Sequence, residues 1–212
     1  MDPAHIAELL RPFARDTVVS PAILEQLQLY LDLLLRWNAR INLTAVRDPE
    51  QIVTRHFGES LFAARILCPA GRDTEICTLA DVGSGAGFPG IPIKLWAPQM
   101  ELTLIESQNK KATFLREVLR TLKVDNAHVF GGRAEDWGND ADVVTLRAVE
   151  KFETALPVAA RVVTPGGRLC LLIGASQLET ARKLLGERWI WDEAHRVPQS
   201  TGRVITIAQR IA

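Results

Sequence analysis

The sequence has few cysteines and no long apolar segment, and both absences narrow the classes of protein it fits. Its three cysteines, Cys68, Cys77 and Cys170, are an odd number and lack the spacing of metal ligands. They are therefore expected to be buried, reduced thiols, as in a cytosolic protein. No apolar run approaches the ~18 residues that a membrane helix needs. The first residues lack the basic-then-apolar order of a signal peptide. We expect a cytoplasmic protein with no membrane partner and no bound metal.

An excess of one charge sign is also missing. The 25 Lys and Arg residues balance 25 Asp and Glu, so the net charge gives no argument for a nucleic-acid partner. Two segments are locally basic, because residues 94–123 and 182–212 each hold six Lys and Arg against three acids. Such charges could line one basic surface, but they more often form an ordinary solvated face. Charge alone leaves RNA binding open.

The first seventy residues carry the signals of helices. Two stretches begin with a capping residue followed by proline at the first helical position: Ser20-Pro21 and Asp48-Pro49. Apolar residues then recur at helical spacing after each start. We expect residues 1–70 to form a helical N-terminal cap on a core of residues 71–212. A chain of 212 residues with 47% hydrophobic content is suited to one compact unit.

Beyond residue 78, short apolar runs alternate with helical segments. Strands are expected over residues 79–83, 102–107, 127–132, 142–148 and 168–174. Helices are expected over residues 87–96, 107–122, 150–163 and 177–189. A last strand over residues 204–211 is expected at an edge of the sheet. This alternation predicts an α/β fold in which helices cover both faces of a mostly parallel sheet.

A glycine-rich turn, DVGSGAGFPGIP over residues 81–92, follows the first expected strand. Glycines let the backbone turn sharply and approach a ligand with no Cβ in the way. In a doubly wound sheet this first turn faces the crevice that holds a nucleotide-like cofactor. The candidate cofactor contacts on the turn are Asp81, Gly83, Gly85 and Gly87.

The same turn contains a literal GxGxxG at Gly85, Gly87 and Gly90, so a dinucleotide site is the rival interpretation. Two features favour S-adenosylmethionine instead. Asp81 places an anion near the loop, which suits a sulfonium and an ammonium better than a pyrophosphate. The GxGxxG also starts two residues late relative to the strand end. Glu106, at the tip of the next strand, could bind the ribose hydroxyls of either cofactor. A loop without a ligand is the third interpretation.

The tip of the third expected strand, residues 131–136, reads GGRAED. In this architecture that tip lies where an adenine ring would lie, and a polar side chain or backbone amide could bind the edge of the ring. A solvated turn is the alternative.

Missing motifs bear on the atom that would be methylated. The Asn/Asp-Pro-Pro-aromatic turn of exocyclic-amine methyltransferases is replaced here by residues 145–148, TLRA. No cysteine falls on an expected active-site loop, where a pyrimidine-carbon methyltransferase needs its nucleophile. No Lys-Asp-Lys-Glu set for a ribose hydroxyl is evident either. A nucleophile that needs no deprotonation remains, such as N7 of guanine, although many small-molecule N- or O-methyltransferases fit equally well.

Over nearly its full length the chain resembles the bacterial small-subunit rRNA methyltransferase G family, also called the glucose-inhibited division protein B family. The glycine turn with its second proline resembles that family's loop very closely. An ordered series of further matches surrounds it: Trp37-Asn38, residues 42–48, Arg55-His56, Ser60, Lys110-Lys111, Phe114-Leu115, Arg133-Ala134-Glu135 and Arg147-Ala148.

The resemblance implies a class I methyltransferase fold with a seven-stranded, Rossmann-like sheet. It also implies methyl transfer from S-adenosylmethionine to N7 of guanine 527, in the 530 loop of 16S rRNA, in the small ribosomal subunit or its precursor. By matched position, the implied cofactor contacts are Gly83, Phe88, Glu106, Ala134, Glu135 and Arg147. No catalytic residue is established, and the candidates are Arg147, His56 and Asn42.

Some positions depart from the family's pattern. Leu146 replaces a serine, Glu59 replaces an aspartate, and Ile173 stands where a lysine is usual. A lysine there is a natural RNA-phosphate contact, so Lys94, Arg133 or Arg203 would have to supply the charge. Trp37, Asn38, Asn42 and Thr44 could form the substrate-side wall of the pocket, or they could only cap and pack the joint between cap and core. A small-molecule methyltransferase and a noncatalytic nucleotide-binding module are the alternative functions, and we expect a monomer.

Overall fold

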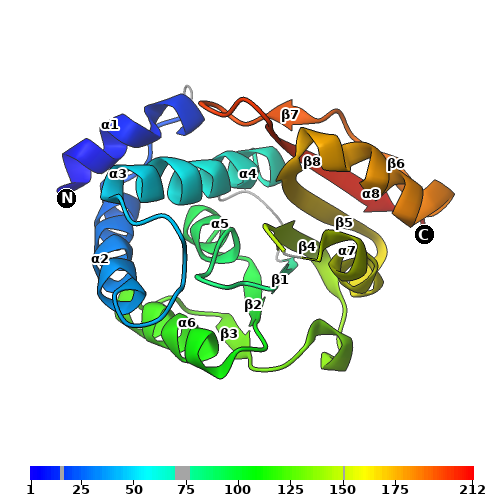
Figure 1. The fold of residues 1–212 in the computed structure, drawn as a ribbon, viewed down its shortest axis with the longest axis horizontal. Helices are drawn as coiled ribbons and strands as arrows, with labels where there is room; N and C mark the ends of the chain where they lie inside the picture. Colours follow the sequence, from blue (N-terminus) through cyan, green and yellow to red (C-terminus); the bar gives the residue numbers. More distant parts are fainter. Residues whose placement is uncertain (15–16, 70–76, 150) are drawn as a thin grey trace.

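The computed structural model describes residues 1–14, 17–69, 77–149 and 151–212, which form a twisted sheet between two groups of helices (Figure 1). Within these residues the sheet has eight strands in the order β3-β2-β1-β4-β5-β8-β6, and β7 also pairs with β8. The strands are β1 Thr78–Val82, β2 Glu101–Ile105, β3 Ala127–Phe130, β4 Ala141–Arg147, β5 Val163–Gly174, β6 Trp189–Trp191, β7 His195–Arg196 and β8 Arg203–Arg210.

Strands β1 to β5 pair in parallel, and β8 runs antiparallel to β5, so the predicted mostly parallel α/β sheet is confirmed. The prediction of an edge position for the last strand is wrong. β8 lies inside the sheet, because β5 covers one side and the short strands β6 and β7 share the other. β6 and β7 pair with opposite ends of β8, so the eight described strands form a sheet that is seven strands wide. Both are too short to show a strand pattern, and Trp189 was expected to end a helix.

The helices of the core follow the strands as predicted. α5 Gly90–Trp96 and α6 Asn109–Leu122 lie on one face, and α7 Phe152–Arg161 and α8 Leu178–Leu185 lie on the other (Figure 1). Short 3-10 turns flank them at η3 Ala134–Asp136, η4 Ala175–Gln177 and η5 Gly186–Arg188. Glu150, where a helix was expected to begin, lies outside the described residues. Successive strand residues face opposite clusters, as Val143 and Val144 do, because side chains alternate across a sheet.

The N-terminal residues form α1 Pro3–Ala14, α2 Pro21–Asn38, α3 Pro49–Ile52, the π-helix η1 Val53–Gly58 and α4 Glu59–Leu67. Both predicted helix starts are confirmed, since the side chains of Ser20 and Asp48 accept hydrogen bonds from the backbone N–H groups of Ile23 and Gln51. These helices share one apolar cluster with α5, α6 and one face of the sheet. The predicted boundary between residues 70 and 71 falls within 70–76, outside the described residues.

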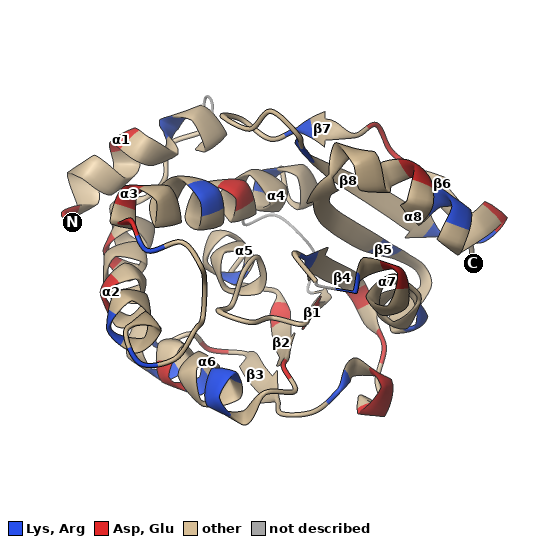
Figure 2. Ribbon diagram, in the orientation of Figure 1, with Lys and Arg blue, Asp and Glu red and all other residues tan. Residues whose placement is uncertain are grey.

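Charged residues of both signs are interspersed along the helices (Figure 2). Lys94, within the first of the two locally basic segments, is buried. No helix in the described ranges has both the length and the apolar character that crossing a membrane requires.

Close packing at the start of α5 generates a stability prediction. A Cβ at Gly90 would lie 2.8 Å from Cβ of Asp81 and 2.9 Å from Cδ2 of Leu104. Gly90→Ala should therefore lower the free energy of unfolding by roughly 1–3 kcal/mol, the usual cost of overpacking. Urea denaturation measures the change. Gly138→Ala is the matched control, because a Cβ there meets nothing within 4 Å, and equal stability losses would contradict the packing argument.

Candidate functional site

The turn after β1 is shaped by glycine conformation. Gly83, Gly85 and Gly87 have φ values of 69°, 57° and 89°, a region that residues with a Cβ rarely adopt. The backbone N–H groups of Gly83 and Ser84 both donate to the carbonyl oxygen of Ile105 at 3.0 Å. The turn is therefore tied to the end of β2.

Asp81 lies beneath this turn and is only 1% exposed. Its Oδ1 accepts a 2.6 Å hydrogen bond from the hydroxyl of Thr145, and its Oδ2 accepts a 3.3 Å bond from the N–H of Gly90. Burial raises the pKa of Asp81 to about 6, and the hydrogen bonds from Thr145, Gly90 and Ser84 oppose that rise. The carboxylate joins β1, β4 and the start of α5, which supports a role in holding the turn.

Glu106 follows β2, and backbone amides hold its carboxylate. Its Oε2 accepts from the N–H of Gly85 at 2.9 Å, and its Oε1 accepts from the N–H of Gln108 at 2.7 Å. Each carboxylate oxygen has a further lone pair, so both can still accept bonds from a diol. The side chain is therefore preorganised at the place where ribose hydroxyls were predicted to bind.

Two cavities meet at this point, with Gly83, Glu106, Ser107 and Val149 in the walls of both. The first, which we call the cofactor cavity, has a volume of about 370 Å³. Its remaining lining residues are Val82, Ile105, Gly132, Arg133, Ala134, Glu135, Lys151, Thr154, Ala155 and Val158. Apolar walls and a carboxylate at one end suit a nucleoside, which presents an aromatic base and a diol.

The second, which we call the substrate cavity, has a volume of about 630 Å³. Its remaining lining residues are Leu43, Thr44, Ala45, His56, Ser84, Gly85, Ala86, Phe88, Gln108, Lys111, Arg147 and Ala148. These come from the N-terminal segment, the glycine turn, α6 and the end of β4. The predicted helical cap therefore also builds one wall of the site.

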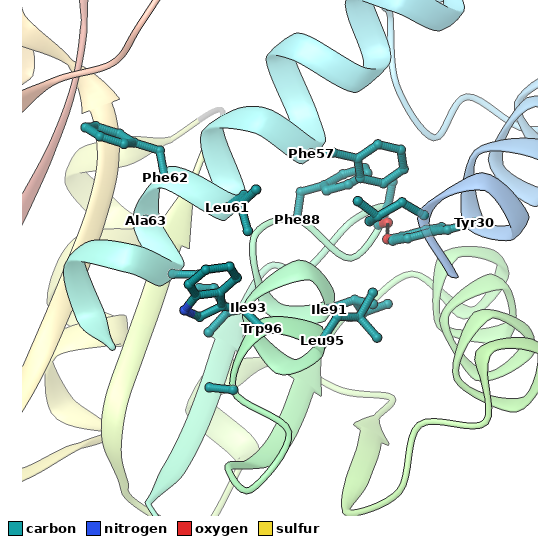
Figure 3. Packing of buried hydrophobic residues seen from close by; sticks show 14 of the residues in the cluster. Tyr30, Phe57, Leu61, Phe62, Ala63, Phe88, Ile91, Ile93, Leu95 and Trp96 are labelled. Atoms are coloured by element: carbon teal, nitrogen blue, oxygen red, sulfur yellow. Dashed lines mark hydrogen bonds between the residues drawn. The ribbon is translucent and has the colours of Figure 1, made fainter. Parts of the chain in front are cut away.

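An aromatic stack joins the cap to the glycine turn. Phe88 stacks on Tyr30 and on His56, with ring centroids 5.4 and 4.9 Å away, and Phe57 meets it edge-on at 5.3 Å. Figure 3 shows Phe88 reaching from the turn toward Phe57 and Tyr30. The hydroxyl of Tyr30 also donates to the carbonyl of Ala86. The turn is thus held on its outer side by α2 and η1.

Arg147, at the end of β4, is the centre of a polar cluster. Its Nη2 lies 2.7 Å from the carbonyl oxygen of Arg55, 3.1 Å from Nδ1 of His56 and 3.3 Å from Oε2 of Glu59. Arg203, from β8, contacts the other carboxylate oxygen of Glu59 at 2.6 Å. Burial raises the pKa of Glu59, and the charges of Arg147 and Arg203 oppose that rise.

His56 is held in one neutral form by its neighbours. Burial and the positive charges of Arg147 and Arg55 lower its pKa to about 3. An arginine can only donate, so we assign Nδ1 of His56 as the acceptor and Nε2 as the protonated nitrogen. Nε2 lies 2.8 Å from Oγ1 of Thr44 and donates to it. A neutral histidine with both nitrogens engaged is not available as a general base.

Most predicted site residues lie together. Gly83 and Glu106 line both cavities, and Ala134 and Glu135 line the cofactor cavity. The wall of the substrate cavity contains Gly85, Phe88, Arg147 and His56.

Three predicted residues are not in either cavity wall. Asp81 is buried beneath the turn, and Gly87 is a buried residue of the turn itself, where a Cβ would clash with the hydroxyl of Tyr30. Asn42 is exposed and lies outside the walls of both cavities. The neighbouring Asn38 is the structural residue of this segment, because its Oδ1 accepts from the N–H groups of Leu43 and Thr44.

Of the three cations considered for the missing lysine, Lys94 is excluded. Its Nζ donates to the carbonyl oxygens of Pro98 and Met100 at 2.6 and 2.5 Å, and it is 3% exposed. Arg203 pairs in register with Gly174, beside Ile173, and lines a smaller cavity of about 150 Å³ with them. Arg133 is exposed on the wall of the cofactor cavity. Both remain accessible to a phosphate.

Sequence reasoning missed Val149 and Lys151, which line the cofactor cavity, and the ion pairs of Glu59. Val149 and Lys151 follow a strand but carry no motif. Glu59 was noted only as a departure from a pattern, since its partners lie 88 and 144 residues away in the chain. In the described ranges, no group of three or more His, Cys, Asp or Glu side chains is arranged to hold a metal ion.

We predict that Gly83→Ala leaves a folded protein with no measurable affinity for S-adenosylmethionine. A Cβ at this position meets no protein atom closer than 3.5 Å, so crowding arises on the ligand side. The positive φ should cost about 1–2 kcal/mol of stability. Isothermal titration measures the affinity. Gly166→Ala is the control, since it has a similar φ of 78° far from both cavities, and wild-type affinity in Gly83→Ala would contradict the prediction.

A pH dependence of stability follows from His56. The unfolded chain takes up a proton near pH 6.5, whereas the native state takes it up only near pH 3, so acidification through 6.5 favours unfolding. Between pH 7 and pH 5, wild type should lose roughly 1–2 kcal/mol relative to His56→Gln. Urea denaturation at the two pH values measures the difference. The other histidines are common to both proteins, and parallel pH profiles would show that His56 titrates normally.

Solved structures with the same fold include several methyltransferases. The chain is similar to a Pyrococcus horikoshii TYW2 structure in complex with MeSAdo, with a TM-score of 0.59 and 15% identity, covering 74% of this chain and 62% of that one. It is also similar to a ribosomal protein L11 methylase from Lactobacillus delbrueckii subsp. bulgaricus, with a TM-score of 0.59 and 17% identity, covering 73% and 80%. At these identities the similarity establishes the class I methyltransferase fold.

Sequence comparison identifies the family. Residues 23–200 match the family model described as rRNA small subunit methyltransferase G. Proteins named ribosomal RNA small subunit methyltransferase G from Streptococcus thermophilus and Streptococcus pyogenes are 36% identical over 198 residues, covering 88% of this chain and 82% of theirs. The predicted cofactor, S-adenosylmethionine, is confirmed by this assignment, and the dinucleotide alternative is wrong. The chain therefore belongs to the rRNA small subunit methyltransferase G family of S-adenosylmethionine-dependent enzymes.

Proposed function

We propose that this enzyme methylates N7 of guanine 527 in the 530 loop of 16S rRNA, acting as a cytoplasmic monomer on the small ribosomal subunit or its precursor. One observation carries the choice of atom: the substrate cavity joins the cofactor cavity, and the one carboxylate among the described residues of its wall, Glu106, is already held by the backbone N–H groups of Gly85 and Gln108. The histidine of this wall is neutral with both nitrogens engaged, and Arg147 is a cation. Such a wall suits a nucleophile whose lone pair is already free.

The residues around the cofactor cavity fit S-adenosylmethionine. Glu106 would accept bonds from the ribose hydroxyls, Ile105 and Val158 would enclose the adenine, and the 134–135 backbone would lie at its edge. The turn at Gly83 lines the junction of the two cavities, where the reacting group would lie. When bound, the cofactor supplies an electrophilic methyl group on a sulfonium. Asp81 supports this arrangement from beneath by holding Gly90 and Thr145.

Alignment of the guanine is the main work left to the protein. The lone pair of N7 lies in the plane of the ring, so the base must enter the substrate cavity with that edge toward Gly83. Fixing two reactants in such an arrangement contributes up to roughly 7–11 kcal/mol in well-oriented systems. Phe88 and His56 already form a rigid stack in the wall of this cavity. The methylated ring carries a positive charge, and no proton has to be removed before it forms.

Cations at the cavity mouths would bind the RNA backbone. Lys111 lines the substrate cavity, Arg133 and Lys151 line the cofactor cavity, and Arg203 lines the smaller cavity beside Arg147. They line these cavities although the net charge of the chain is zero. This local arrangement supports phosphate contacts from a structured RNA.

The proposal predicts one methyl group per small subunit, on N7 of guanine 527. Subunits purified from a bacterium lacking the family's gene are incubated with the enzyme and labelled S-adenosylmethionine. Borohydride–aniline cleavage and mass spectrometry of the 16S rRNA locate the product.

Naked 16S rRNA and precursor particles, tested in parallel, identify the preferred substrate. Subunits already methylated at this position are the control and should accept no label. Label at another nucleotide would refute the assigned position, whereas label only on small molecules would favour the alternative enzyme class.

A further inference from the structure

The hydroxyl of Thr44 lies in the wall of the substrate cavity, and its two acceptor positions are both occupied. Its Oγ1 is 2.8 Å from Nε2 of His56 and 3.1 Å from the backbone N of Val46. The backbone around it is fixed as well, because Asn38 accepts from the N–H of Thr44 at 3.0 Å and donates to its carbonyl at 3.0 Å. The oxygen is therefore held in place on every side except the cavity.

The direction of these hydrogen bonds follows from Arg147, which contacts the other nitrogen of His56. Nη2 of Arg147 can only donate, so Nδ1 of His56 accepts and Nε2 carries the ring proton. Nε2 therefore donates to Oγ1 of Thr44, and the backbone N–H of Val46 donates to the same atom. With both lone pairs engaged, the hydroxyl of Thr44 is left as a donor. Among the described residues, its proton has no acceptor.

We propose that the Thr44 hydroxyl donates a hydrogen bond to O6 of the target guanine and thereby selects guanine over adenine. This inference rests on the proposed function. Guanine presents O6 and N7 side by side on one edge, so a donor on O6 holds the base while N7 stays free. Adenine presents an amino group in place of O6, and the N–H donors of that group would face the hydroxyl donor of Thr44.

The neighbouring groups strengthen this selectivity. The His56 nitrogens are both engaged, so the ring offers no acceptor that could rescue an amino group. Arg147 adds a second source of donors and no acceptor. At this part of the wall Thr44, His56 and Arg147 offer donors and no free acceptor, so an amino group placed there would stay unpaired.

The test compares two substrates that differ only at the O6 and N1 edge of one base. Small subunits are reconstituted with ligated 16S rRNA that carries either guanine or 2-aminopurine at position 527; 2-aminopurine keeps N7 but lacks O6. Both are methylated in competition, which yields the ratio of their kcat/KM values. Because the ratio is internal to each enzyme, partial unfolding of a variant leaves it unchanged. The intrinsic reactivity of the two bases also cancels between enzymes.

Thr44→Val should lower kcat/KM for guanine by about 10- to 100-fold, the worth of one buried hydrogen bond, and leave 2-aminopurine within about threefold. Thr44→Ser keeps the hydroxyl and should retain the wild-type ratio. Thr113→Val, on an exposed face of α6, is the matched control. Affinity for S-adenosylmethionine should stay at the wild-type value in all three.

An unchanged ratio in Thr44→Val would overturn the inference while leaving the proposed function intact, and so would an equal loss on both substrates. Methylation elsewhere by wild type would instead overturn the proposed function, and the guanine contact with it. In wild type, ¹⁵N NMR should show an unprotonated Nδ1 at His56. A protonated Nδ1 would remove the basis for the free donor.

Discussion

The buried carboxylate of Asp81 ties three parts of the chain together at one point. It accepts hydrogen bonds from the hydroxyl of Thr145 on β4 and from the N–H of Gly90 at the start of α5, and it lies directly beneath the glycine turn. A buried carboxylate is stable only with such partners, and they can reach it only when the sheet and helix have assembled. The turn can then remain open toward both cavities without support from a ligand.

A second set of contacts from distant parts of the chain lies beside the substrate cavity. The Arg147 side chain is nearly buried, and a carbonyl oxygen, a carboxylate oxygen and an imidazole nitrogen all contact its Nη2. That arrangement keeps His56 neutral, which in turn orients the hydroxyl of Thr44. An enzyme whose substrate attacks with a free lone pair, as we propose for N7 of guanine, has no need for a base. Its wall can therefore be devoted to holding the nucleobase.

The N-terminal helices belong to the site as much as to the scaffold. Tyr30 and Phe57 pack against Phe88, so the cap is in direct contact with the glycine turn (Figure 3). Thr44 and His56, from the same segment, line the substrate cavity. The N-terminal segment therefore both packs against the glycine turn and supplies part of the wall of the substrate cavity.

Local signals in the sequence determined the helix starts at Pro21 and Pro49, the alternation of strands and helices, and the glycine turn. Each depends on spacing, capping or backbone freedom within a few residues. The family, and with it the cofactor, followed from the same turn and its flanking matches. Only the tertiary structure decided which residues meet. Asp81 was expected at the ligand and lies beneath the turn, Asn42 points to solvent while Thr44 lines the cavity, and β8 lies inside the sheet. These outcomes depend on contacts between residues far apart in the chain, such as Glu59 with Arg147 and Arg203, and no local pattern encodes such pairings.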